Sequence, residues 1–318
     1  MKIGIISNSD IAIPLLYYCK NSGAAVWLYL STAESGSKQQ LQIVDFCRQA
    51  GIPVFSETTP NSLYEWMKTN QFNLVFVSGY TRKIRLSRLP ELRYGIFNIH
   101  YGPLPAYRGP SPVFWQLKAA GATIGLSIHR LSDHWDAGAV VWQTTVPTEP
   151  HFNYSVVHQL FSNLALQGVA FILRTLASGG TLQEFRQETA LARYQGRPAL
   201  NDVLINWNTM DAAGIEALVR ACHGWNNGAM TGWRGMEIKL MDVFATGDTT
   251  TEAGGTVLDD RLSVSCADGR VLQITALSIN GDFVPARFAS RFGLSRGQRF
   301  TPVLSVNIAK ENTAVQTT

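Results

Sequence analysis

Short apolar runs alternate with helical patterns through residues 1–147, and this alternation limits the fold more than any other property of the chain. Continuous apolar runs predict strands, whereas apolar residues recurring at helical spacing predict helices. Consecutive parallel strands must be joined by crossovers, which are usually helices. The alternation therefore predicts an α/β fold with a parallel or mixed sheet and helices on both faces. Strands are expected at 2–7, 25–30, 53–55, 73–77, 95–100, 123–131 and 139–146, and helices from Asp10 (as the N-cap) and at 41–50, 62–69 and 112–120.

A second domain is expected in the remainder of the 318-residue chain, because this length suits two domains. Polar residues accumulate over 183–201, where the chain is expected to cross between them. After a helix at 211–222, short alternating runs separated by Asp/Gly turns predict a small antiparallel sheet or a partly open, OB-like barrel. Its strands are expected at 237–243, 255–258, 262–266 and 271–277, and the predicted boundaries are 1–190 for the N-terminal domain, 191–204 for a linker, 205–305 for the C-terminal domain and 306–318 for a tail.

Several classes of protein are disfavoured by composition. The four cysteines are widely spaced and form no Cys-x-x-Cys pair, which disfavours a disulfide framework or a structural metal and favours a reducing cytoplasm. The longest uncharged stretch, 150–173, contains His and amide side chains and has helical apolar spacing, so an amphipathic helix is expected rather than a membrane span. No Gly-x-Gly-x-x-Gly or Walker motif follows a strand, and a dinucleotide site has no support.

Charge is distributed unevenly between the two halves. Residues 1–200 hold 17 Lys and Arg against 11 Asp and Glu, whereas residues 201–318 hold 10 against 12, giving net charges of +6 and −2. A nucleic-acid platform in the second half would be expected to carry a basic stripe. The net charge there predicts no such platform.

Side chains suited to chemistry concentrate between residues 97 and 138. Asn98 and His100 lie two positions apart at the end of an expected strand, so they project on the same side of it. A loop rich in proline and glycine follows, and its stiffness would hold backbone groups in place. Taken alone, Asn98 and His100 could equally cap the strand end, and Asp136 before Gly138 is typical of a turn.

The combined pattern resembles the signature of the formyltetrahydrofolate-dependent formyltransferases. The matching pieces are Asn98-Ile99-His100, then Leu104-Pro105-x-Tyr107-Arg108-Gly109, then Asp136-x-Gly138. Residues 3–16 are similar to the family's first strand and helix. Residues 205–225 resemble the start of the second domain in methionyl-tRNA formyltransferase and in the amino-arabinose formyltransferase. The resemblance implies a Rossmann-like catalytic domain followed by a β-rich domain.

The resemblance also implies a site for 10-formyltetrahydrofolate as co-substrate, with no metal. Asn98 would donate an N–H to the developing oxyanion, His100 would donate a hydrogen bond or move a proton, and Asp136 would orient the imidazole. The folate contacts implied by position are Gly102, Pro103, Leu104 and Pro105 in the loop, and Ser78, Gly79 and Tyr80 at the end of an earlier strand. Gly102-Pro103 replaces the Ser-Leu of many members, which removes a hydroxyl group.

Two other groups of residues have ordinary explanations. The basic cluster of residues 82–93 is typical of a solvated face and is less often a site for a polyglutamate tail or a phosphate. His129 and His134 flank the candidate site, but no spacing marks them as metal ligands, so neither is expected to bind a metal. The basic cluster comprises Arg82, Lys83, Arg85, Arg88 and Arg93.

The acceptor is expected to be a small amine. In the tRNA-acting branch a basic insertion normally follows the second strand, whereas loop 31–40 here holds only Lys38 and Glu34 as charged residues. With the net charge of the second half, this disfavours tRNA. A nucleotide-linked amino sugar or an amino acid is favoured. A carrier-protein-bound aminoacyl group stays open because Ser111–Trp115 resembles sequences in formylation domains of peptide synthetases.

Two alternatives remain at this point: a methionyl-tRNA formyltransferase, and a folate-binding protein without transfer activity. The sequence leaves the oligomeric state open.

Overall fold

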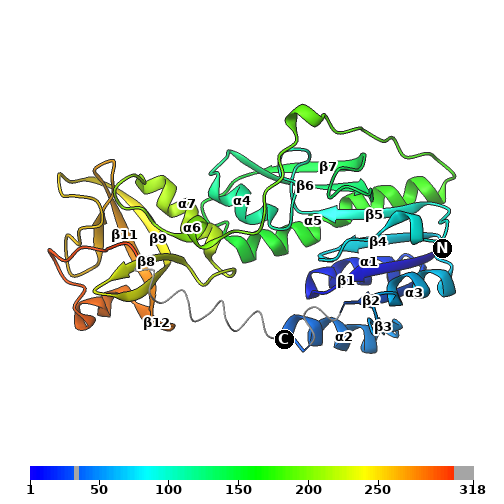
Figure 1. The fold of residues 1–318 in the computed structure, drawn as a ribbon, viewed down its shortest axis with the longest axis horizontal. Helices are drawn as coiled ribbons and strands as arrows, with labels where there is room; N and C mark the ends of the chain where they lie inside the picture. The colour runs from blue at the N-terminus through cyan, green and yellow to red at the C-terminus, as the bar shows by residue number, and fades with distance from the viewer. Residues whose placement is uncertain (32–35, 304–318) are drawn as a thin grey trace. The chain divides into compact units, whose positions relative to one another are not determined.

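The computed structural model describes residues 1–31 and 36–303, and the chain forms two compact units (Figure 1). Unit 1 comprises Met1–Val113, Ala122–Thr148 and Val156–Arg197, and unit 2 comprises Phe114–Gly121, Glu149–Ser155 and Pro198–Thr318. Within the predicted loop 31–40, residues 32–35 lie outside the described residues, as does the whole predicted tail, 306–318.

A seven-stranded sheet forms the centre of unit 1, in the order β3-β2-β1-β4-β5-β6-β7. The five strands β1 to β5 pair in parallel, and β6 and β7 are added antiparallel. The predicted mostly parallel sheet is confirmed. Strand order reverses between β1 and β4, which is where such sheets open a crevice at their carboxyl edge. The strands are β1 (Lys2–Ser7), β2 (Ala25–Leu30), β3 (Val54–Ser56), β4 (Leu74–Ser78), β5 (Gly95–His100), β6 (Thr123–Arg130) and β7 (Val140–Pro147).

The predicted helices are present. α1 (Ile13–Asn21), α2 (Lys38–Ala50) and α3 (Ser62–Asn70) connect the strands from β1 to β4, α4 (Pro112–Lys118) lies between β5 and β6 in the chain, and α5 (Tyr154–Ala177) follows β7. The first helix differs in one detail, because Ser9 rather than Asp10 is the N-cap of a short 3-10 turn, and its hydroxyl accepts from the Ile11 N–H. Asp10 is the first residue inside that turn, where a carboxylate favours the helix dipole.

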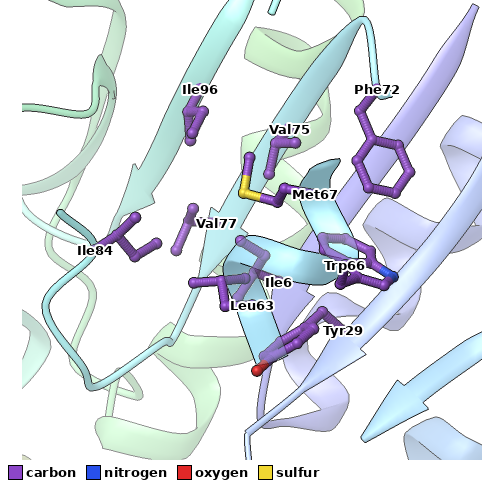
Figure 2. Packing of buried hydrophobic residues seen from close by; sticks show 10 residues of the cluster. All are labelled: Ile6, Tyr29, Leu63, Trp66, Met67, Phe72, Val75, Val77, Ile84 and Ile96. Atoms are coloured by element: carbon purple, nitrogen blue, oxygen red, sulfur yellow. The ribbon is translucent and has the colours of Figure 1, made fainter. Parts of the chain in front are cut away.

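The core between α3 and the sheet shows why the strands are almost wholly apolar (Figure 2). Leu63, Trp66 and Met67 of α3 pack against Ile6, Tyr29, Val75, Val77 and Ile96 of the sheet. Their neighbours in sequence on the strands, such as Ile5 and Phe76, are fully buried as well. A strand buried on both faces needs a continuous apolar run rather than an alternating one.

The predicted uncharged helix is α5, and one face of it is buried. Gly168 lies on that face, where an added Cβ would contact Trp142 of β7 and Ile128 of β6. Among the described helices, α5 has the length and apolar composition of a membrane span, and the core helix of a soluble protein meets the same criteria. Its close packing on the sheet gives its apolar face a partner inside unit 1.

Unit 2 contains a five-stranded antiparallel sheet of order β10-β11-β9-β8, with β12 beside β11. The predicted antiparallel sheet is confirmed, and closure into an OB-like barrel stays a prediction. The strand expected at 255–258 is wrong, because Thr256 and Val257 form only isolated bridges. β8 and β12 were not predicted. The elements are α6 (Leu200–Val203), α7 (Ala212–Cys222), β8 (Ala229–Trp233), β9 (Met236–Thr249), β10 (Ser263–Ser265), β11 (Arg270–Ile279) and β12 (Asp282–Pro285).

Removing one core side chain of α3 tests this packing. Leu63→Ala is expected to lower the free energy of unfolding by about 2–4 kcal/mol, because Leu63 is buried and the sheet residues around it cannot close the cavity. Leu41→Ala on α2 is the matched control, since Leu41 is 59% exposed and the loss should stay within about 0.5 kcal/mol. Urea unfolding followed by circular dichroism measures both, and equal losses would contradict the packing described.

Candidate active site

The carboxyl end of β5 and the turn after β6 bring the three predicted catalytic residues together. Asn98 Nδ2 lies 3.4 Å from Asp136 Oδ1, and His100 Nδ1 lies 3.7 Å from the same oxygen. The other carboxylate oxygen, Oδ2, accepts a 2.8 Å hydrogen bond from the Gly109 N–H. Residues up to 38 positions apart thus converge on one carboxylate.

His100 is buried, and its neighbours fix which ring nitrogen carries hydrogen. Nε2 lies 2.6 Å from the Tyr107 carbonyl oxygen, which can only accept, so Nε2 carries the hydrogen. In the neutral ring, Nδ1 therefore presents a lone pair on the side of Asp136. Burial lowers the pKa of His100, and this effect outweighs the opposing influences of Asp136 and the Tyr107 carbonyl. A neutral imidazole with a free basic nitrogen results.

Asp136 is held ionised. Burial by itself would raise the pKa of its carboxyl group, but contact with His129, the nearby His100 and the Gly109 N–H together lower the pKa to about 2. The residue also has a φ of 51°, a conformation that non-glycine residues adopt only when the surroundings hold them there.

The predicted folate loop is fixed by side chains of the antiparallel strands. Ser127 of β6 accepts from the Leu104 N–H at 3.0 Å and donates to the Gly102 carbonyl at 2.8 Å. Gln143 of β7 donates to the Leu104 carbonyl at 2.9 Å. The peptide bond before Pro105 is cis. The expected stiffness of this loop thus comes from partners as well as from its prolines.

The second predicted folate segment lies at the end of β4, one strand away. Ser78 pairs with Ile99 in the sheet and is buried, and its side chain is hydrogen-bonded to Tyr101. Gly79 is exposed, with a positive φ of 72°. Burial, followed by the charge of Glu57, raises the pKa of Tyr80 to about 12. None of these three residues lines either of two cavities, one of which includes Leu131 and the other Leu104.

Both of those cavities lie within unit 1. One, of about 400 Å³, is lined by residues after β4, which are mostly apolar but include Glu91, and by Arg130 and Leu131, which precede the Asp136 turn. The other, of about 440 Å³, is lined by Leu104, Pro105 and the segment that follows α5. The first cavity includes Leu86, Leu89, Leu92 and Ile96, and the second includes Trp142, Gln143, Phe185 and Gln187.

Sequence reasoning missed the segment 183–197, which it interpreted only as a crossing between domains. Gln187 Nε2 donates at 2.7 Å to the carbonyl of Asp136 and at 2.7 Å to that of Gly138, while its Oε1 accepts two bonds from Arg108. The N–H of Gln195 donates to the Arg108 carbonyl. No local pattern marks Gln187, because its role depends on residues about 50 positions earlier.

His129 also belongs to the site, although sequence reasoning assigned it no role. It is 1% exposed, and its Nε2 lies 3.1 Å from Asn98 Nδ2 and 3.6 Å from Asp136 Oδ1. His134, by contrast, is exposed. Within residues 1–31 and 36–303, no group of three or more His, Cys, Asp or Glu side chains is arranged to hold a metal ion.

The basic cluster is partly anchored to the protein. Arg82 forms a 3.0 Å ion pair with Glu57, whose side chain is buried. Arg88 stacks on Tyr64, with its guanidinium carbon 4.0 Å from the ring centre. These two arginines therefore make local contacts within the protein, and the interpretation of the whole cluster as a solvated face stays a prediction.

The electrostatics of the site give a direct prediction. In NMR titrations, His100 should titrate below its ordinary pKa of 6.5. Asp136→Asn should lower the His100 pKa further, because the wild-type carboxylate stabilises the imidazolium and the substitution removes that charge. A His100 pKa that rises in Asp136→Asn would contradict the geometry.

Both units of the chain match known families and known proteins. The formyl transferase family model matches residues 35–170, and the model of the formyl transferase C-terminal domain matches residues 200–287. The methionyl-tRNA formyltransferase of Nitrosomonas eutropha is 27% identical over 311 residues, covering 94% of this chain and 98% of that protein. The methionyl-tRNA formyltransferase of Paramagnetospirillum magneticum is 27% identical over 282 residues, covering 84% and 88%.

Solved structures share the fold. The N-formyltransferase from Helicobacter canadensis, in complex with folinic acid and dTDP-3-aminofucose, aligns with a TM-score of 0.65 and 17% identity, covering 86% of this chain and 98% of that one. The matched models account for both units and include Asn98, His100 and Asp136. The chain therefore belongs to the formyl transferase family and carries both its N-terminal and its C-terminal domain.

Proposed function

We propose that this chain is an N-formyltransferase that moves a formyl group from 10-formyltetrahydrofolate to a primary amine. The observation that carries the proposal is the convergence of Asn98 and His100 on the largely buried, ionised carboxylate of Asp136. This arrangement offers a hydrogen-bond donor, a neutral base and a fixed negative charge in one place. Those are the groups that acyl transfer to an amine requires.

Each of the three residues has a step in the reaction. The amine nitrogen bonds to the formyl carbon, the bond from that carbon to the folate nitrogen breaks, and one proton moves from the amine to the leaving nitrogen. Asn98 donates an N–H to the oxygen on which negative charge develops, which is worth about 3 kcal/mol for a well-placed donor. His100 takes the amine proton at Nδ1 and returns it to the leaving nitrogen. Asp136 stabilises the imidazolium in between.

The first cavity fits the ring system of the co-substrate, which supplies the formyl group on a nitrogen able to leave. Its apolar walls, formed by Leu86, Leu89, Leu92 and Leu131, suit a flat heterocycle. Leu131 also precedes the turn that carries Asp136, which supports a place for the ring near the reacting groups. The rigid loop Gly102–Pro105 forms the opposite support in this proposal. Folinic acid in the H. canadensis relative is consistent with this choice of donor.

For the acceptor we propose a small amine, such as a nucleotide-linked amino sugar. The absence of excess positive charge in residues 201–318 supports it. The expectation that tRNA is disfavoured is not supported, however, because the relatives from N. eutropha and P. magneticum are methionyl-tRNA formyltransferases that align over both domains.

A tRNA acceptor is the second candidate, and a local feature of unit 2 favours it. Residues 284–300 hold four arginines and no acidic residue. The net charge of −2 for residues 201–318 does not reveal this local excess of positive charge. Phe288 and Phe292 are 40% and 50% exposed among these arginines, and Arg287 and Arg291 lie over the Phe288 ring. Exposed aromatic rings between arginines suit a nucleic acid.

The two domains and the location of the protein complete the proposal. Residues 1–190 carry the transfer chemistry, and residues 205–305 form the accessory domain. A cytoplasmic location fits the four cysteines, which are all buried as free thiols.

Substitutions at the site test the reaction. His100→Ala and Asp136→Asn should each lower kcat for formyl transfer by roughly 10²–10⁴-fold, because the base and its charge partner are lost. The release of tetrahydrofolate from 10-formyltetrahydrofolate in the presence of an amine is the measurement. His134→Ala, an exposed histidine near Asp136, should leave kcat unchanged. If the wild-type protein binds the folate but formylates no amine, the chain is a folate-binding protein and the proposal is wrong.

Acceptor assays separate the two candidates. A small-amine enzyme should formylate amino sugars or amino acids with little salt dependence and ignore charged initiator tRNA. If tRNA is the acceptor, Arg287→Gln with Arg291→Gln should raise the KM for tRNA at least tenfold. The dependence of log affinity on log salt concentration should also become shallower, by a slope of about one for each phosphate that is no longer bound. Arg48→Gln is the control, since Arg48 is an exposed arginine of α2 that pairs with Asp45.

A further inference from the structure

His129 lies against two of the proposed catalytic residues, yet the reaction as described does not use it. It is on β6, directly opposite Asn98 in the antiparallel register, and its side chain is 2% exposed. Its ring approaches His100 edge-on, with 6.2 Å between the centroids. A buried polar ring in this position must have its hydrogen-bonding groups satisfied by neighbours.

The backbone determines how the His129 ring is protonated. Nδ1 lies 2.8 Å from the carbonyl oxygen of Arg130, which can only accept, so Nδ1 carries a hydrogen. In the neutral ring, Nε2 is then an acceptor, and it faces Asn98 at 3.1 Å. The orientation of β6 thus turns an accepting atom toward the Asn98 side chain.

This acceptor decides which way the Asn98 carboxamide points. The end of the amide near His129 Nε2 and Asp136 Oδ1 faces two acceptors, so it must be the NH2 group. One hydrogen goes to His129 at 3.1 Å, and the other is held only by the longer 3.4 Å contact to Asp136. That second hydrogen is the one available to a developing oxyanion.

We propose that His129 is a positioning residue that locks the Asn98 carboxamide with its NH2 group toward the reacting oxygen. The inference rests on the proposed function, because Asn98 is assigned there to the oxyanion. Without the acceptor at Nε2, only the longer 3.4 Å contact to Asp136 Oδ1 keeps the NH2 group in place, so the amide turns more easily to present its own Oδ1, whose partial negative charge repels an oxyanion. A stabilising donor would then become a repulsive group.

Two substitutions separate this role from simple packing. His129→Leu fills a similar space with an apolar side chain but removes the acceptor. It should lower kcat for formyl transfer roughly 10–100-fold with little change in the KM for 10-formyltetrahydrofolate. His129→Gln offers an amide oxygen to Asn98 and should recover most of that loss. His134→Leu, the same change at an exposed histidine nearby, is the matched control and should have no effect.

A readout independent of activity accompanies the kinetics. In the wild-type protein and in His129→Gln, the Asn98 side-chain amide hydrogens should exchange slowly in NMR spectra, and in His129→Leu they should exchange quickly. If Leu and Gln variants are equally active, or if the Asn98 amide is unchanged in His129→Leu, the positioning role is wrong. If no variant or wild-type protein transfers a formyl group but the amide responds as described, the positioning stands and the proposed function fails.

Discussion

The largely buried carboxylate of Asp136 is the group on which the arrangement of the candidate site in unit 1 depends. A carboxylate can stay ionised inside a protein when hydrogen-bond donors replace water. Here the donors are the Gly109 N–H and the Asn98 amide, and the rings of His100 and His129 lie beside the same carboxylate, 3.7 and 3.6 Å from Oδ1. These groups come from β5, β6 and the loop between β5 and α4, so satisfying one charge brings three segments together.

The backbone around Asp136 is held from the other side by the segment after α5. Gln187 uses its amide nitrogen on the carbonyls of Asp136 and Gly138, and its amide oxygen accepts from Arg108. Gly138 has no room for a Cβ beside the Arg130 carbonyl, and Gly109 has none beside the Gln195 carbonyl. Close backbone packing of this kind fixes the left-handed conformation of Asp136, which a non-glycine residue would not keep by itself.

Charge in this chain has to be considered at the scale of a surface rather than of a domain. The net charge of residues 201–318 is slightly negative, yet residues 284–300 carry four arginines with exposed phenylalanines among them. Screening limits electrostatic attraction to about 10 Å at moderate salt, so a phosphate group responds to the arginines within that range and not to the sum over the domain. The net charge of residues 201–318 therefore does not describe the local surface that an anionic partner would meet.

Local sequence patterns were sufficient for the order of elements in unit 1, whereas the resemblance to the formyltransferase signature was needed to single out Asn98, His100 and Asp136 as catalytic candidates. Apolar periodicity is a local property, and it located β5 to the residue, because Gly95–His100 is a mostly apolar run ended by a stiff loop. Prediction from periodicity failed where the apolar pattern is weak. At 255–258 the chain forms only isolated bridges instead of the expected strand, and β8 was missed because its Thr231 and Gly232 resemble a loop.

The membership of His129 and Gln187 in the site, by contrast, emerges only from the folded chain. Their partners Asn98 and Asp136 lie 31 and 51 residues away from them in the sequence. Hydrogen bonds over such separations are set by the pairing of β5 with β6 and by the return of the chain after α5. No local pattern encodes either, because each depends on where the whole sheet places distant segments.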